Sequence, residues 1–371
     1  MKVNSKIRVV VDIRDLQIAA TGTRVFLENL IAEFKQQEEE FVFFYLAPRK
    51  VAYTGEHKVI KIVEHLRYFY WKQIQLPIKA FKLKADIVFC SDFMVPYLKL
   101  GYKTIPVFHD AFFWEYPTHY NKYWLYLFSR LSIAAAKRSF IIATPTSYTR
   151  KKIASHTNIN EDNIHVIGEG FKQIKEEPVN DSIINNKQFI LHVGSFEKRK
   201  NIPTLLKSFK ILINKGVLDY KLVLVGKAPN KPTLSDNDKI QGLISELGLK
   251  DHVILTGYLS DAQVAFLYKK ASLYVFASFN EGFGLPVLEA FNYKVPLIVA
   301  NNSCLTEVAG EGAVRFNPFD EKELADKMVL LLTNRAFSED LVKKGSDRLL
   351  YFSWKKTANI LLSHFKLAAK S

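Results

Sequence analysis

Two glutamates and a glycine loop make up the stretch of this sequence best suited to binding chemistry. Glu281 and Glu289 form an E-x7-E pattern within SLYVFASFNEGFGLPVLEA, residues 272–290. An apolar strand, 273–277, leads into the loop, and a helix follows from Leu285 with Pro286 in its first turn. Unpaired N–H groups and the positive end of a helix dipole would meet there, so the stretch predicts a site for phosphate or another anion.

The two carboxylates suggest what such a ligand carries besides phosphate. Carboxylates are poor partners for phosphate, but they accept hydrogen bonds from hydroxyl groups. A nucleotide-sugar has a ribose diol, a central diphosphate and hexose hydroxyls, and therefore fits both acids. The alternative is that Glu289 only balances the helix dipole and that Glu281 is a solvated loop residue.

A basic turn in the second half of the chain could supply cations for the diphosphate. Arg199 and Lys200 follow a strand, 189–193, and precede a helix that Asn201 is expected to cap and Gly216 to end. Cations beside a positive helix end are unfavourable unless an anion is present. Arginine can hold phosphate oxygens bidentately and lysine adds a point charge. The alternative is a solvated basic turn.

Two residues of the first half are candidates for the same ligand. His109 follows the strand 103–108, and ligands of open α/β sheets bind beyond the carboxyl ends of strands. It could contact a sugar hydroxyl or line the reaction centre, or it could be a structural histidine. Gly22 lies in a Thr-Gly-Thr turn after the strand 7–11, where a backbone could approach a ligand, although a plain turn is the simpler interpretation.

The elements that must position these residues form two consecutive arrays of strands and helices. Apolar strand-length runs alternate with helical patterns, which predicts an α/β fold. The expected strands are 7–11, 41–46, 58–63, 86–89, 103–108, 140–144, 164–167, 189–193, 221–225, 253–255, 273–277, 296–300 and 313–316. A polar stretch with a proline, 171–187, is the expected linker. We place one domain at 1–178, a second at 179–350, and a final helix within 351–371.

The stretch 66–85 has a composition that differs from its surroundings. It is aromatic at its start, lysine-rich at its end, and apolar at helical spacing. A basic amphipathic helix of this kind can lie on an anionic membrane. Because Pro77 interrupts the apolar stripe, we favour an ordinary surface helix that packs on a sheet.

Composition excludes several classes of protein. The chain has 371 residues, 48% of them hydrophobic, which is ample for two buried cores. Its net charge of +15 is spread over both halves and suits anionic small molecules or an anionic membrane surface, while no nucleic-acid-binding motif appears. Two isolated cysteines favour a reducing cytoplasm and give no metal site. The sequence has neither the shape of a signal peptide nor an apolar run long enough to span a membrane. No G-x-G-x-x-G motif follows the first strand, which argues against an ordinary dinucleotide site.

These motifs together resemble the retaining glycosyltransferases of family four (glycosyl transferases group 1), whose GT-B fold has two Rossmann-like domains facing each other across a cleft. The resemblance covers nearly the whole chain. It rests on the E-x7-E stretch with its GFGLP core, the turn from Gly194 to Asn201, the strand end at Gly226, the Gly257-Tyr258 turn, His109-Asp110, and Phe352-Ser353-Trp354. Two departures are the first-domain turn, TGT, and residues 166–170, VIGEG, where proline-asparagine-glycine is commoner.

The resemblance implies a role for each candidate residue. The second domain would hold the donor and the first the acceptor, and the last helix would cross back to the first domain. Arg199 and Lys200 would contact the diphosphate, Glu281 the transferred hexose, and Glu289 the ribose hydroxyls. The remaining implied contacts are the backbone of Phe283, Gly284 and Leu285 for the phosphates, Gly226, Tyr258 and Leu259 for the base, and His109 and Gly22 for the sugar.

The function expected from this resemblance is transfer of a hexose from a nucleotide diphosphate sugar with retention of configuration. Two cations and a helix end would stabilise the leaving diphosphate, so neither a metal nor another cofactor is expected. The run HDAFFWEYP, 109–117, is similar to mannosyl- and related hexosyltransferases of bacterial surface polysaccharides, which favours mannose or glucose and a glycan or lipid-linked glycan acceptor. We expect a cytoplasmic protein, with an anionic membrane surface as a further candidate partner. The alternatives are a sugar-nucleotide epimerase or phosphorylase of this fold, and a non-enzymatic binder of nucleic acid or lipid.

Overall fold

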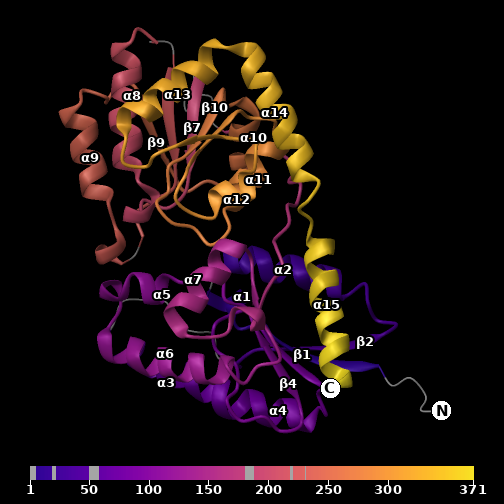
Figure 1. Cartoon of the computed structure of the whole chain (residues 1–371). Helices are drawn as coiled ribbons and strands as arrows, with labels where there is room; N and C mark the ends of the chain where they lie inside the picture. The colour runs from indigo at the N-terminus through magenta and orange to yellow at the C-terminus, as the bar shows by residue number, and fades with distance from the viewer. Residues whose placement is uncertain (1–5, 19–21, 50–57, 180–187, 218–219, 230) are drawn as a thin grey trace. The chain divides into compact units, whose positions relative to one another are not determined.

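A computed structural model describes residues 6–18, 22–49, 58–179, 188–217, 220–229 and 231–371 (Figure 1). The chain divides into two compact units. The first consists of residues 1–170 together with 353–371, and the second of residues 171–352. The sequence placed these divisions at 178 and 350.

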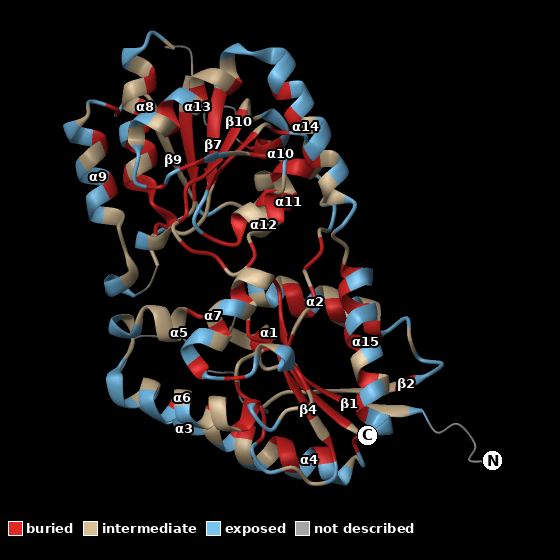
Figure 2. Cartoon of the chain, in the orientation of Figure 1, coloured by how far each residue is buried: buried red, intermediate tan, exposed pale blue. Residues whose placement is uncertain are grey.

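The first unit is built on a parallel sheet of order β2-β1-β3-β4. Its strands are apolar runs, and their residues are mostly buried (Figure 2). A bridge from Val107 to Ala143 joins this sheet to a two-stranded parallel pair. The bounds are β1 (Ile7–Asp12), β2 (Phe41–Leu46), β3 (Ile87–Cys90), β4 (Lys103–Pro106), β5 (Ile142–Thr144) and β6 (Ile164–Val166).

Helices cover this sheet, and one of them comes from the end of the chain. They are α1 (Asp15–Ile18), α2 (Gly22–Phe34), α5 (Phe112–Glu115), α6 (Lys122–Ala136), α7 (Ser147–Thr157) and α15 (Trp354–Lys370). The Phe365 ring of α15 lies 5.8 Å from that of Phe34 and 5.7 Å from that of Phe89, measured between centroids. At the start of α15, a Cβ on Gly170 would stand 2.1 Å from the Trp354 nitrogen, so the backbones meet there. The last helix is therefore part of the first unit's core.

The strand predicted at 58–63 is wrong. Helix α3 (Lys58–Tyr70) begins there and continues through a π-helical turn, η1 (Trp71–Gln75), into α4 (Leu76–Lys82). The β-branched residues of 58–63 imitate a strand, but the apolar residues recur every four positions from Ile62 onward, which is helical spacing.

Pro77 does not interrupt this helix. It sits in the first turn of α4, and the Leu76 N–H donates to the Trp71 carbonyl in the wider π-helical turn. The inner face packs on the sheet as expected, because Trp71, Leu76 and Ala80 cluster with Val10 and Val88.

The second unit is a parallel sheet of order β12-β11-β10-β7-β8-β9. The chain runs outward from β7 to β9, returns to place β10 beside β7, and continues outward to β12. The bounds are β7 (Gln188–Val193), β8 (Tyr220–Val225), β9 (Val253–Gly257), β10 (Leu273–Phe276), β11 (Leu297–Ala300) and β12 (Val314–Phe316). This is the Rossmann strand order, and its direction reverses between β7 and β10.

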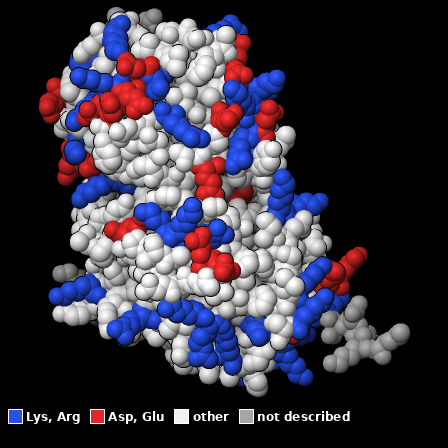
Figure 3. Space-filling model, viewed as in Figure 1, with Lys and Arg blue, Asp and Glu red and all other residues white. Residues whose placement is uncertain are grey.

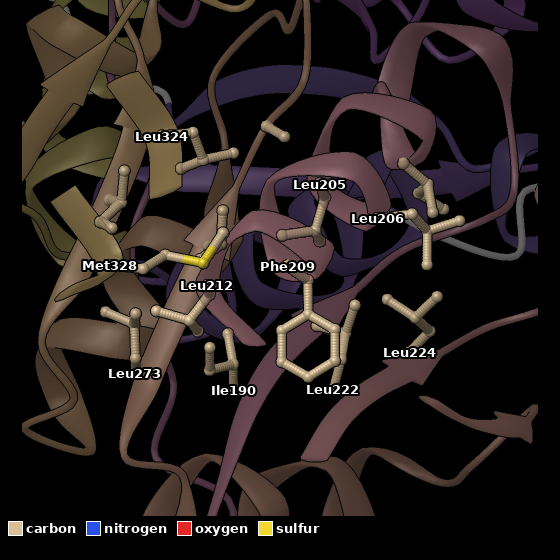
Figure 4. Packing of buried hydrophobic residues seen from close by; sticks show 14 of the residues in the cluster. Ile190, Leu205, Leu206, Phe209, Leu212, Leu222, Leu224, Leu273, Leu324 and Met328 are labelled. Carbon is tan, nitrogen blue, oxygen red and sulfur yellow. The ribbon is translucent and has the colours of Figure 1, made fainter. Parts of the chain in front are cut away.

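The helices of the second unit pack on this sheet through leucine-rich faces. They are α8 (Ile202–Asn214), α9 (Asn237–Glu246), α10 (Asp261–Lys270), α11 (Leu285–Asn292), α12 (Leu305–Ala309), α13 (Glu321–Thr333) and α14 (Arg335–Leu349). Leu205, Phe209 and Leu212 of α8 pack with Ile190 and Leu222 of the sheet (Figure 4). This core fixes the strand ends from which the site residues project.

Helix ends show which capping predictions were correct. Ser260 caps α10 in a capping box with Gln263. Gly216 follows α8 with a φ of 86°, which confirms it as the stop. Asn201 is not a side-chain cap of α8. Its backbone is left-handed, with a φ of 55°, and its amide donates to the Pro318 carbonyl at 2.8 Å.

Candidate functional site

Three glycines bring the carboxyl ends of β7, β8 and β9 close together. The Gly194 N–H donates to the Val225 carbonyl and the Gly226 N–H to the Gly257 carbonyl, both at 2.9 Å. A Cβ on Gly226 would lie 2.0 Å from the Gly194 oxygen, and φ at Gly226 is 138°. Only glycine fits such an approach. At these three strand ends the candidate site is therefore lined by backbone atoms.

The basic turn after β7 meets the loop after β10 through a cluster of charged side chains. Arg199 Nη1 lies 2.6 Å from Glu281 Oε2, and Lys200 Nζ lies 2.7 Å from Glu281 Oε1. Arg199 Nε also pairs with Glu197 at 2.7 Å. Lys200 and Glu281 are only 8% and 9% exposed. The structure therefore brings Glu281 together with Arg199 and Lys200, which the sequence proposed from a separate stretch.

The electrostatics of this cluster follow from its low exposure and its composition. Burial opposes ionisation of Glu281, but the charges of Arg199 and Lys200 outweigh it and lower the carboxyl pKa to about 2. Burial and the neighbouring Arg199 charge lower the pKa of Lys200. Two cations and the two carboxylates of Glu197 and Glu281 cancel one another. Glu281 therefore supplies negative charge beside the basic turn.

The loop after β10 is held in one shape by contacts that the sequence did not indicate. Gly284 precedes α11 with a φ of 97°, and a Cβ there would lie 2.6 Å from Leu305 Cδ2. The buried Cys304 thiol donates to the carbonyls of Glu281 and Phe283, at 3.0 and 3.3 Å. A lone cysteine in a sequence gives no signal of such a role. The backbone of Phe283, Gly284 and Leu285 lies at the start of α11, as predicted.

Glu289 lies one turn into α11, is half-buried, and has a carboxyl pKa shifted by its surroundings. Burial raises its pKa to about 7, with Asp261 adding to the rise, while Tyr268 and Lys200 act in the opposite sense. Tyr268 on α10 is fully buried beside it, and the sequence analysis missed this residue. The Glu289 carboxyl therefore keeps its proton to a higher pH than an ordinary glutamate does.

Tyr258 and Leu259 follow β9 at the same edge of the sheet. Tyr258 is 76% exposed, and Lys227 Nζ lies 5.9 Å from the centre of its ring. Leu259 is half-buried. A flat, exposed ring beside a cation is a surface on which a nucleotide base could stack.

His109 and Gly22 lie in the first unit, whereas the site residues described above lie in the second. His109 is close to a carboxylate, with Nδ1 3.7 Å from Glu169 Oε1, and its Nε2 is 2.9 Å from the Ser91 carbonyl. Burial lowers its pKa, but Glu169 outweighs this and raises it overall. Glu169 belongs to the unusual VIGEG run and was not among the predicted residues.

Gly22 begins α2 and is exposed, and an added Cβ would meet nothing within 4 Å. Its geometry therefore does not require glycine. The same helix contributes Phe26, whose ring meets His109 edge-on at 4.8 Å between centroids.

The second unit is a Rossmann-ordered α/β unit with a charged turn at its switch point, which is where ligands of such sheets bind. Arg199 and Glu281 follow β7 and β10, the two strands that flank that point. The model of Glycosyl transferases group 1 matches residues 173–348, and that of Glycosyltransferase Family 4 matches residues 20–172. Together the two models match residues 20–348, and the chain belongs to the family-four glycosyltransferases (glycosyl transferases group 1).

Comparisons with individual proteins agree with this assignment. The chain is 26% identical over 353 residues to the serotype-specific mannosyltransferase WbdA of Escherichia coli, covering 88% of this chain and 41% of WbdA. It is 29% identical to the O-antigen chain mannosyltransferase RfbU of Salmonella typhimurium, over 74% of this chain and 72% of RfbU. The chain thus spans about two fifths of WbdA.

Two solved structures share the fold. Sucrose-phosphate synthase from Thermosynechococcus elongatus gives a TM-score of 0.77 at 18% identity and covers 99% of this chain and 100% of that one. Anabaena HepE, solved in complex with UDP, gives 0.69 at 14% identity and covers 98% and 100%. The GT-B fold with two Rossmann-like units is therefore confirmed. Within the part of the chain that the structure describes, none of the helices combines the length and the apolar composition that a membrane span needs.

Proposed function

We propose that this protein is a retaining, metal-independent glycosyltransferase that moves a hexose from a nucleotide diphosphate sugar to a glycan or lipid-linked glycan in polysaccharide biosynthesis. The observation that carries the proposal is the Arg199–Lys200–Glu281 cluster at the switch point of a Rossmann-ordered sheet. Family membership and the mannosyltransferase relatives support the reaction class. The UDP complex of HepE supports a nucleotide-sugar donor.

The proposed chemistry places charge where the sugar–phosphate bond breaks. The anomeric carbon becomes positive while the leaving diphosphate gains a negative charge. Arg199, Lys200 and the N–H groups at the start of α11 would stabilise that diphosphate, so no metal is required. Glu281 holds both cations at fixed positions, which reduces the reorganisation needed when the charge develops.

Retention would follow from attack on the same face that the diphosphate leaves. The acceptor oxygen forms the new bond to the anomeric carbon as the carbon–oxygen bond to phosphate breaks. The acceptor hydroxyl proton passes to a leaving phosphate oxygen, so no side chain has to act as a covalent nucleophile. The sequence offers no residue in the loops around Glu281 that stands out for that role.

The other candidate residues would bind the two ends of the donor. Glu289 would accept from the ribose hydroxyls, and Gly226, Tyr258 and Leu259 would surround the base. The backbone of residues 283–285 would donate to phosphate. From the first unit, His109 and Gly22 would face the hexose, for which mannose or glucose is proposed. With a lipid-linked acceptor, the enzyme would work in the cytoplasm at the inner face of the membrane.

The test begins with a thermal-shift screen of nucleotide diphosphate sugars, because a donor that binds only the folded state raises its melting temperature. The best donor is then incubated with membrane-extracted and synthetic glycan acceptors in the presence of a chelator. The proposal expects a new glycoside whose anomeric configuration, measured by proton NMR, equals that of the donor. An inverted product, a chelator-sensitive reaction, or conversion of the donor sugar without an acceptor would contradict it, the last outcome favouring an epimerase or phosphorylase.

A further inference from the structure

An exposed apolar row runs along the outer side of the long helix in the first unit. Its members recur about every fourth position through α3, η1 and α4, and they are 46–64% exposed: Ile62, Leu66, Tyr70, Ile74, Ile78 and Phe81. The opposite side of this helix already packs on the sheet through Trp71, Leu76 and Ala80. The helix is therefore apolar on two sides, and only one of them is covered by the protein.

The row continues onto neighbouring segments. Helix α6 exposes Tyr123, Tyr126 and Leu127, and its Trp124 ring lies 5.2 Å from that of His65 on α3. The segment after β3 exposes Tyr97 and Leu98. Its Tyr97 N–H donates to the Gln73 side chain of η1 at 2.9 Å. These contacts join the three segments into one surface, called here the apolar face.

The charges around the apolar face are almost all positive. Four cations within residues 60–84 are exposed, Arg67, Lys79, Lys82 and Lys84, and the one acid in the sequence of this stretch, Glu64, pairs with Arg67. Residues 122–138 contain four lysines or arginines and no acid. Lys and Arg side chains gather over the α3, α4 and α6 part of this unit (Figure 3).

Several of these cations lie against the aromatic rings of the face. Lys122 stands 5.0 Å from the Tyr123 ring centre, Arg130 5.0 Å from that of Tyr126, and the Arg138 guanidinium 4.5 Å from that of Tyr97. The long aliphatic stem of a lysine or arginine can lie along an apolar surface while its charged end reaches the solvent. Aromatic rings with adjacent cations suit the boundary between acyl chains and headgroups.

We propose that the apolar face binds the surface of a bilayer containing anionic phospholipids. The apolar row, roughly 30 Å long at 1.5 Å per residue, would enter the headgroup boundary while the surrounding cations meet lipid phosphates. A second copy of the chain is a poor occupant, because two faces of the same positive charge would repel each other. An acidic protein partner would match the charge but would leave no reason for a continuous row of large aliphatic and aromatic side chains.

Membrane binding at this face would bring the first unit to the surface in which a lipid-linked acceptor diffuses. The inference nevertheless does not depend on the proposed transfer reaction. Vesicle binding is measured without donor or acceptor, so its failure and a failure of transfer are separate results.

The experiment compares partition of the full chain into vesicles of phosphatidylcholine and of phosphatidylcholine with phosphatidylglycerol. We expect at least about tenfold stronger binding to the anionic vesicles, weakened by added salt. The apolar variant Leu66→Ser/Ile74→Ser/Phe81→Ser should lose about tenfold or more in binding. Its matched control, Leu350→Ser/Tyr351→Ser/Leu367→Ser, changes residues of similar exposure elsewhere and should bind like the wild type.

A second pair of variants separates the charge from the apolar contribution. Lys79→Glu/Lys82→Glu/Lys122→Glu should bind anionic vesicles much more weakly. The control Lys239→Glu/Lys250→Glu/Lys322→Glu carries the same net charge on exposed positions of the second unit and should bind within about twofold of the wild type. Unchanged melting temperature and donor binding would show that each variant is folded.

Three results would overturn the proposal. One is wild-type protein that does not bind vesicles or binds both compositions alike. Another is an apolar-face variant that binds as the wild type does. The third is a wild-type dimer, seen by light scattering, that the apolar variant converts to monomers, since a second copy would then cover the face.

Discussion

At the scale of single residues, Glu281 pairs at once with the buried Lys200 and the half-buried Arg199. Replacing it by glutamine would leave Arg199 and Lys200 without their shared counter-ion, and breaking a buried pair in this way typically costs about 3 kcal/mol. We expect Glu281→Gln to lower the free energy of unfolding by about that amount at pH 7, measured by urea denaturation. A change below about 0.5 kcal/mol would contradict the cluster.

The pH dependence of this effect has a definite sign. Because the Glu281 pKa is lowered from 4.5 to about 2 in the folded protein, its stabilisation is present above about pH 4.5 and is lost as pH falls toward 2. The difference between wild type and Glu281→Gln should therefore shrink across that range. A difference that stays constant from pH 6 to pH 3 would assign the loss to packing instead.

Glu289 should behave in the opposite way. Its folded pKa of about 7 lies above the ordinary value of 4.5, so the folded protein loses stability as pH rises from about 4.5 through 7. Glu289→Gln should match the wild type near pH 4.5 and exceed its unfolding free energy by about 3 kcal/mol at pH 8. The same variant should bind the donor more weakly in calorimetry. Unchanged donor affinity would remove the ribose role, whatever the stability result.

At the scale of elements, the strand-end turns of the second unit depend on glycine. A Cβ on Gly226 would clash with the Gly194 carbonyl, and the positive φ adds strain. We expect Gly226→Ala to destabilise the protein by more than about 1 kcal/mol and to weaken donor binding. Gly242→Ala is the matched control, because Gly242 lies inside α9 with nothing within 4 Å, and alanine should stabilise a helix there by about 0.5–1 kcal/mol. Equal effects of both substitutions on thermal unfolding would contradict the close approach of the two turns.

At the scale of the whole molecule, the last helix of the chain, α15, packs into the hydrophobic core of the first unit. Phe365 of α15 is fully buried against Phe34 and Phe89. Phe365→Ala should destabilise the first unit by about 3–5 kcal/mol, whereas Leu367→Ala, on the exposed side of the same helix, should be nearly neutral. Hydrogen exchange in β1 and β3 would report the loss. Comparable exchange in the two variants would mean that α15 contributes little to that core.

Sequence patterns predicted the fold well where the pattern was local. Apolar strands and Gly216 as a stop depend on neighbouring residues, and apart from the run 58–63 they were found. The strand prediction at 58–63 failed because β-branched residues are typical of strands, whereas the apolar residues here recur with a helical period.

The contacts between the site residues could not be predicted from the sequence for a different reason. Arg199 and Glu281 are 82 residues apart and meet only because β7 and β10 are neighbours in the sheet.

The central claim is that Arg199 and Lys200 stabilise the leaving diphosphate, and the rate of sugar transfer tests it most directly. The double variant Arg199→Ala/Lys200→Ala should lower kcat/KM by at least about 10²-fold, the size of loss seen when a transition-state donor is removed. Lys198→Ala, in the same turn but exposed, should leave it within about twofold. A double variant that is folded and transfers the hexose as fast as the wild type would contradict the account.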